Sequence, residues 1–150
     1  MSAETGVQVP VSVVELVPES FAELVDADQV LIVDDYPGAR YLRSRILSEA
    51  GYEVVEASSG NEALAIARSV VPSLILLDVN LPDISGFEVC ERLKQDPVTS
   101  SIPIIQITGA WLSEDARRQG MASGANAYLV EPVDDVTLLR NVVMLIESPT

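Results

Sequence analysis

Five short apolar runs alternate with stretches in which hydrophobic residues recur every three or four positions. Two of the runs, QVLIV (29–33) and SLILL (73–77), are hydrophobic at nearly every position, as expected of strands that are buried on both faces. The spacing between the runs is typical of amphipathic helices. The predicted strands are 29–33, 52–57, 73–77, 103–108 and 127–130. Five strand–helix repeats predict an α/β domain in which helices cover both faces of a parallel sheet.

The hydrophobic spacing also predicts which side of each helix faces the sheet. The fourth helix has a weak apolar stripe, and we expect it to be the least firmly packed. The residues predicted to face inward are Leu42, Ile46 and Ala50 in the first helix; Ala63, Leu64, Ala67, Val70 and Val71 in the second; Phe87, Cys90 and Leu93 in the third; and Val136, Leu139, Val143 and Ile146 in the last.

Local signals mark several helix ends. Two Ser-x-x-Glu sequences have the spacing of capping boxes, in which each side chain binds a free amide at the other residue. Proline suits a first helical position, and glycine suits the left-handed residue that follows a helix. The predicted starts are Pro37, Ser59 with Glu62, Ser85 with Glu88, and Ser113, and the predicted left-handed caps are Gly51 and Gly124.

Residues 1–28 differ from the rest of the chain. They contain six acidic residues and no Lys or Arg, and their alternating valines are compatible with an edge strand. A linker from an upstream domain explains them equally well. We therefore divide the chain into an N-terminal extension or linker (1–28) and one domain (29–147).

Composition excludes several classes of function. The net charge of −14 opposes binding to nucleic acid or to anionic lipid. The absence of histidine excludes His-based catalytic triads and the usual His ligands of zinc. No signal peptide or membrane-spanning run is apparent, and the single cysteine, Cys90, has core spacing and suits a reducing compartment. We therefore expect a cytoplasmic protein.

Acidic residues follow the predicted strands at one edge of the sheet. Asp34 and Asp35 follow the first strand, Asp78 follows the third, Thr108 ends the fourth, and Glu131 follows the fifth. Ligands of open parallel sheets bind at this carboxyl edge. Neighbouring carboxylates repel one another, and Mg²⁺, which prefers oxygen ligands, would offset that repulsion. A carboxylate beside such an ion can also act as a nucleophile toward a phosphoryl group.

The sequence resembles the receiver domains of bacterial two-component signalling over about residues 29–146. The resemblance lies in the runs LIVDDYPGARYLRSRILSEAGYEVVEASSGNEAL, LILLDVNLPDISGFEVCERLK, IPIIQITGA and GANAYLVEPVD. It implies a flavodoxin-like, doubly wound sheet with strand order 2-1-3-4-5. It also implies a signalling module that is not an enzyme and whose partner is a sensor histidine kinase or a histidine phosphotransfer domain. The segments DVNLPD and GFEVCERLK are similar to those of receivers linked to sensor kinases.

The resemblance assigns a role to each acidic or polar residue at the sheet edge. Under it, a partner's phosphohistidine donates the phosphoryl group, and the domain needs Mg²⁺ or Mn²⁺. The implied roles are Asp78 as phosphoacceptor; Asp35, Asp78 and the Asn80 backbone carbonyl as metal ligands, with Asp34 assisting through water; Thr108 as the hydroxyl that binds the phosphoryl group; and Tyr128 as the switch aromatic.

One position departs from the family pattern. Receivers carry a lysine before the proline that follows the fifth strand, whereas this chain has Glu131. We expect Glu131 to weaken retention of a phosphoryl group, unless it turns into solvent or joins the metal shell. The resemblance also implies a cis bond between Glu131 and Pro132. A homodimer is possible, through the surface of the fourth helix, fifth strand and fifth helix or through residues 1–28.

Three other functions compete with a phosphoaccepting receiver. The first is a pseudo-receiver, a protein-interaction module of the same fold that is not stably phosphorylated, and Glu131 favours it. The second is an aspartate-nucleophile phosphatase. Such an enzyme would need a downstream lysine and a second acidic pair, and this sequence has neither. The third is a flavodoxin-like electron carrier. It is disfavoured because no hydroxyl-rich, phosphate-binding loop follows the first strand.

Overall fold

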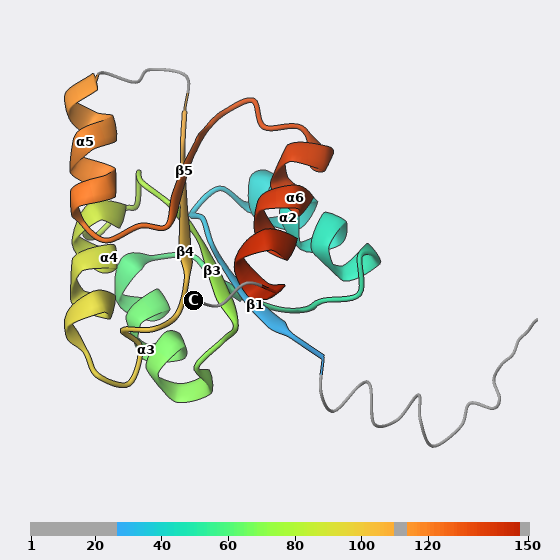
Figure 1. The fold of residues 1–150 in the computed structure, drawn as a ribbon, viewed down its shortest axis with the longest axis horizontal. Helices are drawn as coiled ribbons and strands as arrows, with labels where there is room; N and C mark the ends of the chain where they lie inside the picture. Colours follow the sequence, from blue (N-terminus) through green and yellow to red (C-terminus); the bar gives the residue numbers. More distant parts are fainter. Residues whose placement is uncertain (1–26, 110–113, 148–150) are drawn as a thin grey trace, which may run out of the picture.

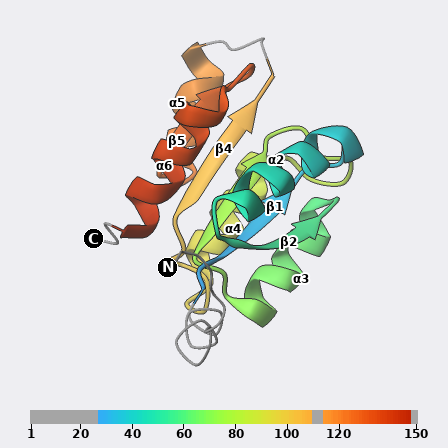
Figure 2. The ribbon, with the colours of Figure 1, turned by 90° about the vertical axis from the view of Figure 1, so that its right-hand side faces the viewer.

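The computed structural model describes residues 27–109 and 114–147, which form one five-stranded parallel sheet with helices on both faces (Figure 1). The strand order is β2-β1-β3-β4-β5, as predicted. The arrows of β1 and β4 point the same way in the view turned by 90° (Figure 2). Within the described residues, no helix is long and apolar enough to cross a membrane. The elements are β1 (Gln29–Val33), α2 (Pro37–Glu49), β2 (Glu53–Ala57), α3 (Gly60–Val70), β3 (Leu74–Asp78), α4 (Gly86–Gln95), β4 (Ile104–Thr108), α5 (Glu114–Ala122), β5 (Ala127–Val130) and α6 (Asp135–Glu147).

The alternation of side chains along each strand divides the core into two halves. Successive strand residues point to opposite faces, so β1 sends Leu31 and Val33 to one face, and Val30 and Ile32 to the other. The first face packs against α3 and α4, and the second against α2 and α6. Figure 1 shows the same division, with α3, α4 and α5 on one side of the sheet and α2 and α6 on the other.

The predicted inward stripe is wrong at two of its three positions in the first helix, while Ile46 packs against the core as predicted. Leu42 is 58% exposed and Ala50 is exposed, whereas α2 buries Arg43 and Leu47. The buried residues of α2 lie one position after the predicted Leu42 and Ile46, and one of them is an arginine. Hydrophobic spacing alone assigns such a residue to the solvent side.

The last helix shows a similar error at two positions, while Leu139 and Ile146 pack against the core as predicted. Val136 and Val143 are exposed, and the fully buried residues of α6 are Leu138 and Val142. This helix is apolar on more than one side, so the sequence offered two stripes. Val70, the last residue of α3, and Val71, its C-cap, are also exposed, while Ala63 and Ala67 are buried as predicted.

The helix ends agree with the sequence signals in most respects. Pro37 begins α2, and Gly51 and Gly124 have φ values of +102° and +106°. The hydroxyl groups of Ser59 and Ser85 accept hydrogen bonds from the amides of Glu62 and Glu88. Neither box is reciprocal, because the Glu62 carboxylate binds the Ser58 amide and the Glu88 carboxylate pairs with Arg92. The predicted start at Ser113 lies outside the described residues.

The loop after β3 is held in place at two points. The Asp83 carboxylate accepts hydrogen bonds from the amides of Gly60 (2.8 Å) and Asn61 (2.7 Å) at the start of α3. The amide of Gly86 donates to the Val79 carbonyl at 2.8 Å. A Cβ atom on Gly86 would lie 2.3 Å from the Asp78 carbonyl oxygen. The fold therefore requires glycine at position 86 to bring α4 against the end of β3.

We expect Gly86→Ala to destabilise the fold although alanine is the better helix former. The added methyl would meet backbone atoms of Asp78 and Val79, which cannot move aside as a side chain can, and overpacking of this kind costs about 1–3 kcal/mol. Gly38→Ala, at an exposed position in the first turn of α2, is the matched control, because the atoms nearest its Cβ would be those of the Tyr36 side chain, the first at 3.1 Å. Thermal unfolding of both variants is the measurement. Equal midpoints would contradict the close approach at residue 86.

Candidate functional site

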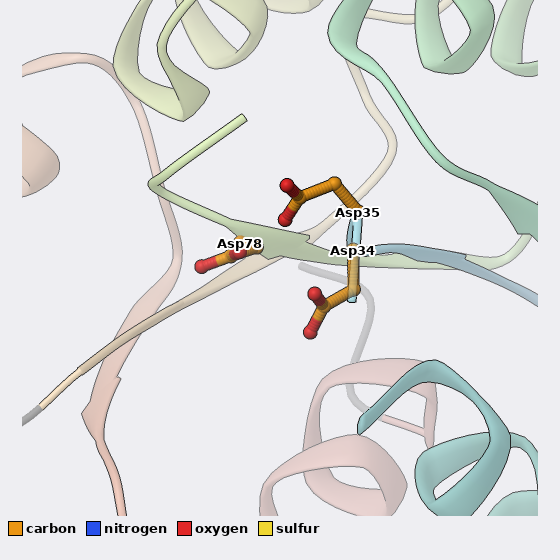
Figure 3. Close-up of side chains that lie close together, drawn as sticks. All are labelled: Asp34, Asp35 and Asp78. Atoms are coloured by element: carbon orange, nitrogen blue, oxygen red, sulfur yellow. The ribbon is translucent and has the colours of Figure 1, made fainter. Parts of the chain in front are cut away.

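Strand register brings three carboxylates together at one edge of the sheet. Val33 pairs with Leu77 across β1 and β3, so the next residues along the two strands, Asp34 and Asp78, are neighbours. One carboxylate oxygen from each of Asp34, Asp35 and Asp78 lies within 4.8 Å of the others. Figure 3 shows Asp34 and Asp35 leaving the end of β1 and Asp78 leaving the end of β3.

The three acids differ in how far the protein already satisfies them. Asp34 is only 4% exposed, and its two oxygens accept hydrogen bonds from the Tyr36 amide (2.9 Å) and Arg43 Nη1 (2.8 Å). Asp35 is exposed and Asp78 is partly exposed. Asp35 and Asp78 are therefore the carboxylates best placed to bind a ligand directly, while Asp34 is mainly held by the protein.

Asp78 is the acid whose ionisation the surroundings oppose most clearly. Burial, followed by the negative charge of Asp34, raises the pKa of Asp78 from 3.8 to about 6. The amide of Asn80, which donates to Asp78 Oδ1 at 3.3 Å, and the charge of Arg43 both act in the opposite direction. A partly desolvated carboxylate beside other anions is well suited to bind a cation.

The site has the donor chemistry of a hard divalent cation. All three converging side chains offer oxygen, and Mg²⁺ is usually held by one or two carboxylates together with water and phosphate. Asp35 and Asp78 fit that requirement. The Asn80 backbone carbonyl follows directly after Asp78 and stays a predicted third ligand.

Thr108 ends β4, the strand next to β3, and Tyr128 lies on β5, the next strand out. Thr108 ends β4 and is buried, and it pairs with Val130 of β5. Burial raises the pKa of Tyr128, and the nearby Thr108 opposes that rise. A Cβ on Gly120 of α5 would lie 2.5 Å from the Tyr128 ring. The aromatic side chain therefore packs directly against the backbone of α5.

Glu131 is placed at the same edge but does not stand alone. Its amide donates to the Thr108 carbonyl at 2.8 Å, and its peptide bond to Pro132 is cis, as predicted. Its carboxylate forms an ion pair with Arg43 Nη2. The sequence suggested solvent or a metal shell as alternative positions for this side chain, and the structure gives it a protein partner instead.

Arg43 is the site residue that the sequence analysis missed. Among the described residues, Arg43 and Asp34 are the only charged side chains that are buried. Arg43 lies four residues before the buried Leu47 on α2, which is the spacing of one helix face. The excess of acids at the sheet edge was the signal that a buried cation was needed.

Comparison with known proteins gives a consistent result. Residues 30–143 match the sequence profile of the family described as Response regulator receiver domain. Response regulator PleD of Caulobacter vibrioides is 44% identical over 115 residues, which are 76% of this chain and 25% of PleD. The chain therefore spans about a quarter of the length of that relative.

Solved structures show the same likeness. A chain from Chloroflexus aurantiacus described as a response regulator superposes with a TM-score of 0.77 at 35% identity, over 81% of this chain and 98% of that one. The receiver domain of a Pseudomonas aeruginosa sensor histidine kinase gives a TM-score of 0.75 at 26% identity, with coverages of 81% and 98%. That domain has a magnesium ion coordinated in its active-site cleft.

The raised pKa of Asp78 predicts a pH-dependent gain in stability for Asp78→Asn. Because the folded-state pKa of about 6 exceeds 3.8, the favourable contribution of Asp78 is complete below about pH 4 and is lost as the pH rises through about 6. In metal-free buffer at pH 7.5, the variant should be more stable than wild type by about 1–2 kcal/mol, after allowance for solvent screening. Near pH 4 the two should be equal.

Urea unfolding from pH 4 to 8 measures this difference. Asp83→Asn is the matched control, because two backbone amides lower the pKa of Asp83. Asp83 therefore stabilises the fold above its unfolded pKa, and that stabilisation is lost as the pH falls. The control should be less stable than wild type at pH 7.5. A pH-independent effect of Asp78→Asn would contradict the environment described for Asp78.

Proposed function

Because this chain belongs to the response regulator receiver domain family, we propose that it accepts a phosphoryl group on Asp78. The donor would be the phosphohistidine of a sensor histidine kinase or of a histidine phosphotransfer domain. The convergence of Asp34, Asp35 and Asp78 within 4.8 Å carries the proposal. It places one partly exposed carboxylate beside two others that can recruit a divalent cation.

The reaction is a transfer between two partners that leaves this chain modified. An Asp78 carboxylate oxygen attacks the phosphorus atom, a P–O bond forms, and the P–N bond of the donor breaks. The electron pair of that bond returns to the imidazole nitrogen, which takes up a proton. The product on this chain is an acyl phosphate. The chain is a substrate of the transfer, so we propose no catalytic turnover of its own.

A Mg²⁺ ion, or Mn²⁺ in its place, fits the oxygen-only donors of Asp35 and Asp78, and the Asn80 carbonyl is the proposed third ligand. When bound, the ion would neutralise charge on the phosphoryl oxygens and on the acids. The related kinase receiver with magnesium in its cleft supports this choice. Asp34, whose oxygens already bind Tyr36 and Arg43, would act through water.

Thr108 and Tyr128 are proposed to report the modification. The Thr108 hydroxyl at the end of β4 would bind a phosphoryl oxygen, and the Tyr128 ring would respond to the movement of Thr108. Tyr128 packs against Gly120 of α5. Gly120 is the only buried residue in the described length of this helix. A weakly anchored helix is a suitable element to shift when its neighbour moves.

The proposed partners are proteins. The net charge of −14 opposes direct contact with nucleic acid or with an anionic membrane, and a cytoplasmic location agrees with a partner kinase. A homodimer is a further proposal.

The second candidate is a pseudo-receiver that binds a partner without stable phosphorylation. Glu131, an acid at the position where the family carries a lysine, is the observation that favours it. A phosphorylated side chain carries nearly two negative charges near neutral pH, and an acid close by would repel it. The lifetime of the acyl phosphate separates the two candidates.

We expect Mg²⁺ to shift the backbone amide resonances of residues 34–36 and 78–80 more than those elsewhere. The measurement is an NMR titration of the metal-free protein, with Asp78→Asn as the variant that should lose most of the response. Asp83→Asn is the control, because Asp83 binds amides of α3 and lies outside the acid cluster. A response confined to other acidic segments would contradict the site.

We expect wild type to gain one phosphoryl group from acetyl phosphate or phosphoramidate in the presence of Mg²⁺. Intact-mass measurement should show the gain, and hydroxylamine should remove it, as for an acyl phosphate. Asp78→Asn should take no label, while Asp83→Asn should still be labelled. Equal labelling of the Asp78→Asn variant would exclude Asp78 as the acceptor. Wild type that folds, binds Mg²⁺ and takes no label would favour the pseudo-receiver.

A further inference from the structure

One buried arginine joins elements that are far apart in the sequence. Arg43 is 8% exposed. Its Nη1 donates to Asp34 Oδ2 at 2.8 Å, and its Nη2 pairs with the Glu131 carboxylate. The guanidinium therefore lies between the end of β1 and the end of β5, at the edge of the sheet that holds Asp78.

The burial of Arg43 needs compensation by these acids. Removing a charged group from water costs several kcal/mol unless it is paired and hydrogen-bonded. Arg43 gains two ion pairs, and Asp34 is buried with it. An arginine can serve both because its planar guanidinium presents five N–H donors in a fixed arrangement. Two nitrogens serve the acids, so further donors are available to a third anion.

The charge balance of the edge requires a cation when a phosphoryl group arrives. Phosphorylation replaces the single negative charge of Asp78 with nearly two, beside the three carboxylates of Asp34, Asp35 and Glu131. Arg43 binds Asp34, which offers a carboxylate oxygen within 4.8 Å of one of Asp78, and the charge of Arg43 lowers the pKa of Asp78. Arg40 is the other cation close by, but its Nε pairs with Glu56 and its Nη1 binds the Asp34 carbonyl.

We propose that Arg43 is the residue that binds the phosphoryl oxygens on Asp78, and that Glu131 positions its guanidinium. The cation that the family supplies from the position of Glu131 is supplied in this chain from α2. Glu131 then positions the guanidinium of Arg43 and does not weaken retention of the phosphoryl group. This inference rests on the proposed phosphoryl site at Asp78 and adds the residue that recognises the group.

The first test compares the affinity for beryllofluoride, a phosphoryl mimic, in the presence of Mg²⁺. Hydrogen bonds to charged groups contribute about 1.5–3 kcal/mol, so Arg43→Leu should weaken binding by about 10- to 100-fold. Arg43→Lys keeps one charge but cannot bridge two acids as arginine does, and its loss should be smaller. Arg40→Leu is the matched control on the same helix, and we expect a change of less than about threefold, because Arg40 is already paired with Glu56.

The second test moves the charge back across the sheet edge. In Arg43→Leu with Glu131→Lys, one cation again lies between β5 and Asp34, and affinity should recover by about tenfold or more relative to Arg43→Leu alone. Glu131→Lys alone places an ammonium beside the guanidinium, so it should bind beryllofluoride and hold acyl phosphate no better than wild type. Urea unfolding of each metal-free variant checks that the fold is retained.

Several results would overturn the inference. These are unchanged affinity in Arg43→Leu, an equal loss in Arg40→Leu, no recovery in the double variant, or a gain in Glu131→Lys alone. If Arg43→Leu does not fold, Arg43→Lys and the double variant decide by the same comparisons. Failure of the proposed function looks different: wild type would take no label from a phosphodonor, whatever the ratios of affinity among the variants.

Discussion

Repulsion among carboxylates at one edge of a parallel sheet is the constraint on which the rest of the structure depends. Parallel pairing of β1 with β3 makes Asp34 and Asp78 neighbours, and Asp35 joins them within 4.8 Å. Two unit charges about 4 Å apart at an effective dielectric near 20 repel by roughly 4 kcal/mol. The fold must provide countercharges for this edge, or leave a position that a cation can fill, and it does both.

The inner and outer acids meet this constraint in different ways. Asp34 is enclosed by the Tyr36 amide and the Arg43 guanidinium, so its charge is compensated by the protein itself. Asp35 is exposed and Asp78 is partly exposed, and each contributes a carboxylate oxygen to the converging group. The same guanidinium also binds Glu131. Arg43 thereby connects the acidic cluster at the ends of β1 and β3 to the end of β5.

The sequence predicted the sheet correctly because strands buried on both faces leave an unambiguous apolar pattern. It also predicted the position of the acids, since each directly follows or ends such a run. It failed for the stripe of α2, where the inward position is Arg43 and not Leu42. Pattern reading treats charge as exposure, and only the tertiary partners Asp34 and Glu131 make a buried arginine stable. The tether from Asp83 to the start of α3 was equally invisible, because the two segments are distant in sequence.

Stability and function are opposed at this edge. Burial and the charge of Asp34 raise the pKa of Asp78 to about 6, so near neutral pH the fold holds a carboxylate ionised in surroundings that disfavour it. The same cost favours a cation near Asp78, because a positive charge beside the carboxylate would stabilise its ionised form. The loop from Asp78 to Gly86 is held at two points, because Gly86 packs on the Asp78 carbonyl and the Asp83 carboxylate binds an amide at the start of α3. Within the fold, the Asn80 amide and the charge of Arg43 lower the pKa of Asp78 and so offset only part of that cost.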